Sequence, residues 1–194
     1  LELKAFLSDP KENQRVCAVP GYGSKVPLYI LGSSLFGAQL AAILGLPFAF
    51  ASHFAPDALE QAIGIYRSEF EPSEQLQEPY VMLGFNICAA DNDEEAIYLK
   101  SSGLQALINL RSGNPGPLPP PIRDFEKNLC GVEKQLASQS KSASSTGAPE
   151  KIREDVSNFI SHTQADELIF TSQIFDHSAR VRSYEISQEA CQGL

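Results

Sequence analysis

The 194-residue sequence lacks long apolar runs and clusters of basic residues. No stretch approaches the ~20 apolar residues of a membrane-spanning helix, because the longest candidate is interrupted by Gly45 and Pro47. The net charge is −9, and the Lys and Arg residues are dispersed. These absences argue against a membrane protein, and against binding to nucleic acid or to an anionic membrane surface.

The four cysteines are too far apart in the sequence to form a zinc or dithiol motif. They stand alone at positions 17, 88, 130 and 191, without a C-x-x-C pair. We therefore expect free thiols and a cytoplasmic location. The chain has no signal-peptide pattern at its start. It begins with Leu1, and its only methionine is Met82, which predicts a processed chain or a piece of a longer protein.

Apolar runs alternate with helical patterns along most of the chain. The runs 26–32, 47–52, 80–90 and 165–173 are typical of buried strands, and a segment of helical character follows each. Asp91 is the expected N-cap of the helix after the third run. Alternating strand–helix units predict a parallel sheet, so we expect an α/β domain over 1–194 with about four units.

An insertion at 112–150 precedes the last strand. It opens with the proline-rich stretch "SGNPGPLPPP", which excludes a helix or a central strand. A helical segment follows, and then the small polar stretch "SKSASSTGAPE", which we expect to be disordered.

The first predicted strand ends in Gly32-Ser33-Ser34, directly before a helix. In parallel α/β folds, ligands bind at the carboxyl ends of the strands. Backbone N–H groups at a helix N-terminus, together with two hydroxyl groups, suit an anion such as phosphate. The alternative is that Ser33 or Ser34 only caps the helix.

Ser52 and His53 end the second predicted strand, at the same edge of the sheet. A histidine there is suited to proton transfer, because its ordinary pKa lies near neutrality. The alternative is a structural role, since the sequence identifies no partner for His53. No metal site is predicted, because the acidic run 93–95 lies at a helix start, where carboxylates favour the helix dipole.

Three stretches, in this order, carry a family resemblance: "VPLYILGSSLFGAQLAAILGLPFAFASHFAP", "YVMLGFNICAADNDEEA" and "GAPEKIREDVSNFISHTQADELIFTSQIFDHSARVRSYEI". Together they resemble the luciferase-like, flavin-dependent monooxygenases, especially the alkanal monooxygenase-like subgroup. The resemblance implies half of a (β/α)8 TIM barrel, the C-terminal half with strands five to eight. A whole barrel needs roughly 250 residues.

The resemblance also implies a site and a reaction. Gly32, Ser33 and Ser34 would hold the phosphate of reduced FMN, while Ser52 and His53 would line the pocket, with His53 the candidate catalytic residue. O2 would be the co-substrate, and an aldehyde or similar small organic molecule would be oxygenated in a bacterial, cytoplasmic enzyme. A separate flavin reductase would supply the reduced flavin.

Half a barrel exposes two strand edges and an apolar face. We therefore expect this chain to self-associate or to pair with a missing N-terminal half, and to be inactive alone. Two other functions stay open. One is a non-catalytic half-barrel that binds flavin or phosphate and self-associates. The other is a doubly wound α/β domain that acts on a different phosphorylated ligand.

Overall fold

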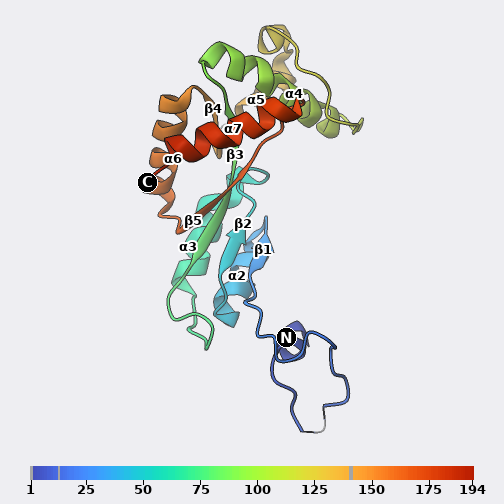
Figure 1. The fold of residues 1–194 in the computed structure, drawn as a ribbon, viewed down its shortest axis with the longest axis vertical. Helices are drawn as coiled ribbons and strands as arrows, with labels where there is room; N and C mark the ends of the chain where they lie inside the picture. Colours follow the sequence, from blue (N-terminus) through green and yellow to red (C-terminus); the bar gives the residue numbers. More distant parts are fainter. Residues whose placement is uncertain (1, 13, 140–141) are drawn as a thin grey trace.

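The computed structural model describes residues 2–12, 14–139 and 142–194, and within these ranges it contains one sheet of five parallel strands (Figure 1). The strands are β1 (Ile30–Gly32), β2 (Phe48–Phe50), β3 (Val81–Ala89), β4 (Ser144–Gly147) and β5 (Glu167–Thr171). The parallel sheet with intervening helices confirms the predicted α/β class.

The helices alternate with these strands. The longer ones are α2 (Leu35–Leu44), α3 (Leu59–Ser68), α4 (Asp93–Arg111), α6 (Pro149–Thr163) and α7 (His177–Ala190). The shorter ones are α1 (Glu2–Leu7), α5 (Gly131–Gln139) and the 3-10 helices η1 (Pro56–Ala58) and η2 (Phe125–Asn128). Among the described residues, no helix combines the length and the apolar character needed to cross a bilayer.

Strand β3 is the centre of the sheet. Its first residues pair with β2, its middle with β5 and its last residues with β4. Since β2 and β5 both pair with the first half of β3, they lie on opposite sides of it. Among the described residues, β1 pairs with β2 alone and β5 with β3 alone, so the order β1-β2-β3-β5 has β1 and β5 as its outer strands.

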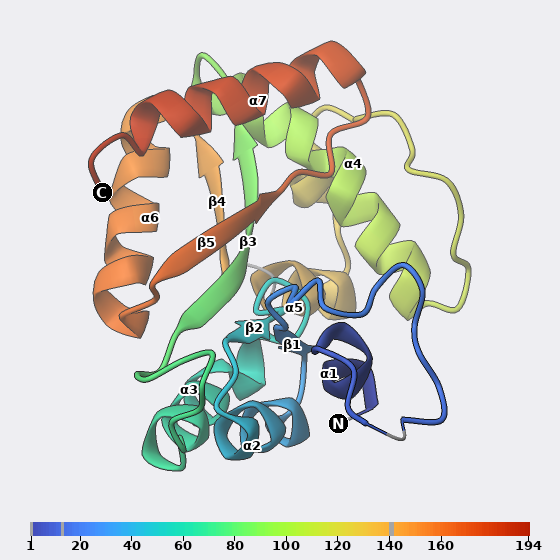
Figure 2. The same ribbon diagram turned by 60° about the horizontal axis from the view of Figure 1, so that its bottom comes forward.

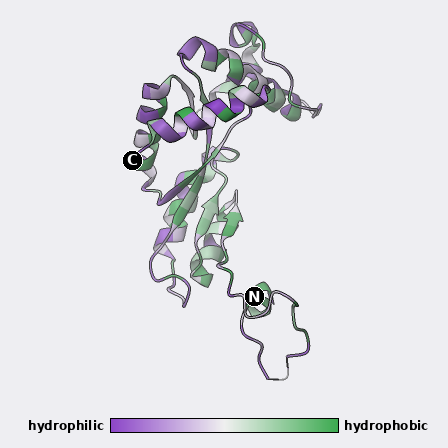
Figure 3. Ribbon diagram, viewed as in Figure 1, coloured by the Kyte–Doolittle hydropathy of each residue, from purple (hydrophilic) through white to green (hydrophobic). Residues whose placement is uncertain are grey.

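Helices α2, α3 and α6 cover one face of this sheet, and α2 and α3 lie side by side (Figure 2). The core packs alternate strand residues, such as Phe48, Leu83 and Phe85, against α2, α3 and α6. Figure 3 shows apolar residues along β2 and many polar residues along α6 and α7. The intervening strand residues face the other way, where Leu31 is 75% exposed and Ile169 is 48% exposed. The sheet therefore has an open face as well as a covered one.

The structure corrects two predictions. The stretch 140–150 was expected to be disordered, yet β4 lies within it and pairs with the end of β3; residues 140 and 141 lie outside the described residues. The N-cap of α4 is Asn92 and not Asp91, because the Asn92 side chain accepts a hydrogen bond from the Glu95 N–H at 2.9 Å. Asp91 instead pairs with Arg182 of α7 at 3.1 Å.

Candidate functional site

The turn Gly32–Ser34 joins β1 to α2 at the carboxyl edge of the sheet. Ser34 is the N-cap residue, with extended backbone angles of φ −144° and ψ 167°, but its side chain makes no capping hydrogen bond. Both serine side chains are exposed. The capping alternative for Ser34 is therefore not realised, and the start of α2 keeps the backbone donors that suit an anion.

Small residues let α2 approach this turn closely. A Cβ atom added to Gly37 would lie 3.3 Å from the Cα atom of Gly32, which is tighter than ordinary packing. Ala38, Ala41 and Ala42 on the same helix are buried. The two glycines therefore fix the position of the helix N-terminus directly beside the end of β1.

Ser52 lies at the end of β2 and is fully buried. Its hydroxyl donates a hydrogen bond of 2.6 Å to the carbonyl oxygen of Gly84 in β3. This bond ties the segment after β2 to the middle of β3. The prediction that Ser52 contacts a cofactor stays a prediction, and its hydroxyl already has a partner within the chain.

His53 packs its imidazole ring on Gly84. A Cβ atom added to Gly84 would lie 2.1 Å from His53 Nδ1 and 2.7 Å from Cε1, so the ring occupies the space that a side chain would fill. Nδ1 is buried and has no hydrogen-bond partner among the described residues. Burial lowers the pKa of His53, and the nearby Gly84 backbone partly offsets this. The ring is therefore neutral at pH 7.

A cavity of about 390 Å³ opens beside His53. Asn86 lines it from β3, Gln173 lines it from the segment after β5, and Leu104 and Leu107 line it from α4. A volume of this size lies at the lower end of the range for small-molecule sites, roughly 300–1,000 Å³. Helix α4 thus lies over the carboxyl end of β3 and walls the cavity with apolar side chains.

Sequence reasoning missed Asn86 and the contribution of α4. Asn86 accepts a hydrogen bond from Thr171 of the neighbouring strand, which holds its side chain in place. A Cβ added to Gly103 of α4 would meet the Cβ of Gln173 at 3.1 Å, so this glycine permits the close approach. Glycine within a strand or helix is a signal of such approaches, and it was available in the sequence.

A second buried polar group without a partner lies at the same edge. The hydroxyl oxygen of Ser172, directly after β5, is buried and unpartnered in the part of the chain that the structure describes. Buried polar groups without partners are rare and call for a bound group or water. With His53 Nδ1, the carboxyl edge of the sheet therefore has two groups that a ligand or solvent would satisfy.

The thiol of Cys88 lines the cavity but is unsuited to act as a nucleophile. Burial raises its pKa to about 12, an effect that Lys100 partly offsets. The thiol also lies 3.3 Å from the carbonyl oxygen of Ala96. Since the thiolate is the reactive form, Cys88 acts as a small core residue.

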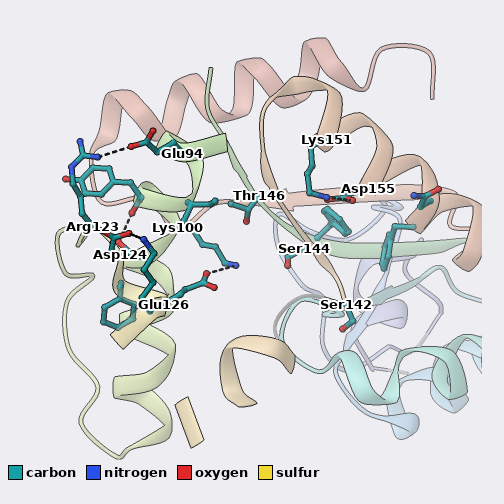
Figure 4. A pocket seen from close by; sticks show the side chains of 18 of the residues that line it. Glu94, Lys100, Arg123, Asp124, Glu126, Ser142, Ser144, Thr146, Lys151 and Asp155 are labelled. Atoms are coloured by element: carbon teal, nitrogen blue, oxygen red, sulfur yellow. Dashed lines mark hydrogen bonds and ion pairs between the residues drawn. The ribbon is translucent and has the colours of Figure 1, made fainter. Parts of the chain in front are cut away.

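A larger cavity, of about 1010 Å³, lies between α4 and α6 (Figure 4). Its charged side chains form ion pairs with one another, as the dashed lines in Figure 4 show. The pairs are Arg123–Glu94 at 3.7 Å, Lys100–Glu126 at 3.3 Å, Lys127–Asp124 at 2.5 Å and Lys151–Asp155 at 2.9 Å. Because these charges neutralise one another, the cavity carries no strong preference for an ionic ligand. The strand ends remain the better candidate.

The comparisons with known proteins show which family the chain belongs to. Residues 6–166 match the model of the luciferase-like monooxygenases. A relative from Escherichia coli (strain K12), described as a luciferase-like monooxygenase, is 47% identical over 193 residues; the match covers 100% of this chain and 58% of the relative. The chain thus spans less than two thirds of the length of that relative.

Solved structures share the fold of this chain. The crystal structure of apo-MsnO8 superposes with a TM-score of 0.85 at 28% identity, covering 97% of this chain and 57% of that one. Two more distant structures share the fold, an F420-dependent secondary alcohol dehydrogenase (14% identity, TM-score 0.56) and a riboflavin lyase with modified FMN (17% identity, TM-score 0.53). They cover 92% and 87% of this chain, and 52% and 45% of the respective neighbour. The neighbours are TIM barrels, of which this chain corresponds to about half.

Proposed function

The chain belongs to the luciferase-like monooxygenase family, and from this premise we propose that it holds reduced FMN in an enzyme that oxygenates an aldehyde or similar small organic molecule. Reduced FMN supplies two electrons, so that one atom of O2 enters the substrate and the other leaves as water. The observation that carries the proposal is the turn Gly32–Ser34, where the N-terminus of α2 lacks a side-chain cap.

Three features of this edge support flavin mononucleotide as the ligand. The phosphate would bind the backbone N–H groups at the start of α2 and the hydroxyls of Ser33 and Ser34. The cavity beside His53 would receive the apolar part of the cofactor or the substrate, because α4 lines it with leucine side chains. The unpartnered His53 Nδ1 and Ser172 hydroxyl would find partners in a bound molecule.

His53 is proposed as the residue that faces the reacting molecules. Its ring is neutral because burial lowers its pKa, so it can accept a proton at one nitrogen and donate from the other. Ser52 would act indirectly, since its bond to the Gly84 carbonyl holds the strand on which the His53 ring rests. We also propose a bacterial, cytoplasmic enzyme served by a separate flavin reductase; its four free cysteines support a reducing compartment.

Titration with FMN and with riboflavin tests the phosphate site. We expect FMN to bind at least about tenfold more tightly than riboflavin, because charge-assisted hydrogen bonds are worth roughly 1.5–3 kcal/mol each. Ser33→Ala/Ser34→Ala should weaken FMN binding while leaving riboflavin binding unchanged. Ser68→Ala/Ser138→Ala, which removes two exposed hydroxyls on other helices, is the matched control. Equal affinity for FMN and riboflavin in the parent chain would contradict the assignment, and adding F420 to the series tests the deazaflavin alternative.

A second candidate function is a half-barrel that binds flavin or phosphate without turnover. The open sheet face favours it, because Leu31 and Ile169 are exposed there while oxygenation requires a site that excludes water. Photoreduced FMN, O2 and a long-chain aldehyde would distinguish the two. Aldehyde consumption matched to flavin oxidation supports the monooxygenase; flavin oxidation with the aldehyde unchanged supports the non-catalytic module.

A further inference from the structure

Asn86 of β3 lies in the wall of the cavity beside His53. Side chains alternate along a strand, so Asn86 shares a face with Gly84, on which the His53 ring packs. The two strand positions are roughly 7 Å apart, because a strand advances by about 3.3 Å per residue. A small molecule in the cavity can therefore contact both Asn86 and His53.

One hydrogen bond fixes the direction of the Asn86 amide. The hydroxyl of Thr171, which is in register with Asn86 across β3 and β5, donates to Asn86 Oδ1 at 2.5 Å. Among the described residues, none accepts a hydrogen bond from Asn86 Nδ2. Asn86 is half-buried, and Nδ2 is not one of the buried polar atoms that lack a partner, so it remains accessible. The amide thus keeps its oxygen toward β5 and presents two N–H donors.

The other walls of the cavity favour a ligand with a hydrogen-bond acceptor and an apolar body. Leu104 and Leu107 supply apolar surface from α4, and Lys100 and Arg111 of the same helix also line the cavity. In the part of the chain that the structure describes, no Asp or Glu lines it. The cavity therefore has no carboxylate to attract an amine, whereas the Asn86 donors suit a carbonyl oxygen.

We propose that Asn86 is a specificity-determining residue of the candidate site, and that its NH2 group donates a hydrogen bond to a carbonyl oxygen of the bound molecule. Thr171 is a positioning residue, since its hydroxyl keeps the amide from turning over. The inference rests on the proposed function for the identity of that molecule. The flavin ring and the aldehyde both carry a carbonyl group, and the experiment below separates these two sources.

Difference infrared spectroscopy on the whole chain tests the proposal, because a hydrogen bond lowers the stretching frequency of a carbonyl group. The probes are FMN and 2-decanone, a ketone with an apolar chain. We expect the carbonyl band of one bound probe to lie at a lower frequency in the parent than in Asn86→Asp, whose carboxylate has no donor. The dissociation constant of that probe should rise at least about tenfold, because its carbonyl would face a second acceptor. Asn158→Asp makes the same charge change at an exposed position on α6, outside this cavity, and should behave as the parent does.

Two variants of Thr171 test the positioning role without changing Asn86. Thr171→Val should remove part of the frequency shift, because the freed amide can turn its oxygen toward the ligand. Thr171→Ser keeps the hydroxyl and should restore the parent spectrum. Urea unfolding verifies that each variant is folded. If Asn86→Asp does not fold, the difference between Thr171→Val and Thr171→Ser decides the question.

The band that responds identifies the source of the carbonyl. A response of FMN assigns the flavin ring to Asn86, and a response of 2-decanone assigns the substrate. The proposal is overturned if both probes keep their carbonyl frequencies and dissociation constants in Asn86→Asp, or if the parent binds neither probe at millimolar concentration.

Failure of this inference is distinguishable from failure of the proposed function. FMN that binds the parent and Asn86→Asp alike, with the ketone also unaffected, overturns the role of Asn86 and leaves flavin binding in place. A ketone band that depends on Asn86 in a chain that does not bind FMN contradicts the proposed cofactor and supports the role of Asn86.

Discussion

Replacing Gly84 by alanine tests the position of the His53 ring. The added Cβ would lie 2.1 Å from Nδ1 and 2.7 Å from Cε1 of His53. The ring would have to withdraw by roughly 1 Å or more to restore ordinary contacts in a close-packed site. Overpacking of this kind costs typically ~1–3 kcal/mol of the free energy of unfolding. Because His53 is only half-buried, the ring can turn outward, and we expect a cost of about 1–2 kcal/mol.

Urea unfolding followed by circular dichroism measures this cost, at fixed protein concentration because association would shift the midpoint. The decisive comparison is a double-mutant cycle. If the clash is with the His53 ring, Gly84→Ala should cost at least about 1 kcal/mol less in a His53→Ala background than in the parent. An equal cost in both backgrounds would refute the assigned contact.

The same substitution at a second glycine, Gly64, should raise the free energy of unfolding instead of lowering it. Gly64 lies on the exposed side of α3, and a Cβ added there would have no atom within 4 Å. Gly64→Ala should therefore stabilise the chain by roughly 0.5–1 kcal/mol, because alanine loses less conformational entropy in a helix.

Three further predictions follow from other contacts. Gly45→Ala should destabilise the chain by at least ~1 kcal/mol in urea unfolding, because φ is +59° and the new Cβ would lie 2.4 Å from the Glu71 carbonyl oxygen. Tyr66→Phe should cost ~1–3 kcal/mol in the same assay, since the buried hydroxyl donates to the Leu46 carbonyl oxygen at 2.9 Å. Burial lowers the pKa of His53 in the folded chain, so at a pH below about 6.5 the unfolded chain binds more protons than the folded chain. The free energy of unfolding should therefore fall as the pH drops below about 6.5. Thermal melts from pH 7.5 to 5 should show a shallower fall for His53→Gln, and an unchanged slope would contradict the assigned burial.

The sequence was sufficient to predict the elements that carry strong local patterns. Strand β3 and helices α2 and α6 have long apolar runs or clear helical periodicity, and each lies where that pattern predicts. Strand β4 has neither. Its residues Ser144–Gly147 are small and polar. They form a strand because β2 pairs only with the first residues of β3, which leaves the backbone groups at the end of β3 to pair with β4. Such pairing depends on tertiary context, which local propensity does not contain.

The candidate site was predictable only in part. Its strand ends followed from the rule that ligands bind at the carboxyl edge of a parallel sheet, which placed Gly32, Ser33, Ser34 and His53 correctly at that edge. The cavity wall was not predictable, because it needs α4 to fold back over β3 and to approach Gln173 at Gly103. That contact joins residues 70 positions apart and depends on the path of the insertion.

Two contacts of Gly84 link the segment after β2 to the middle of β3. Its carbonyl oxygen accepts the Ser52 hydroxyl, and its missing side chain leaves the space for the His53 ring. Successive residues at the end of β2 therefore both use the same residue of β3, one through a hydrogen bond and one through packing. A change at Ser52 should then act on the orientation of His53 before it acts on any ligand. This distinguishes a positioning role for Ser52 from the direct cofactor contact that the family resemblance implies.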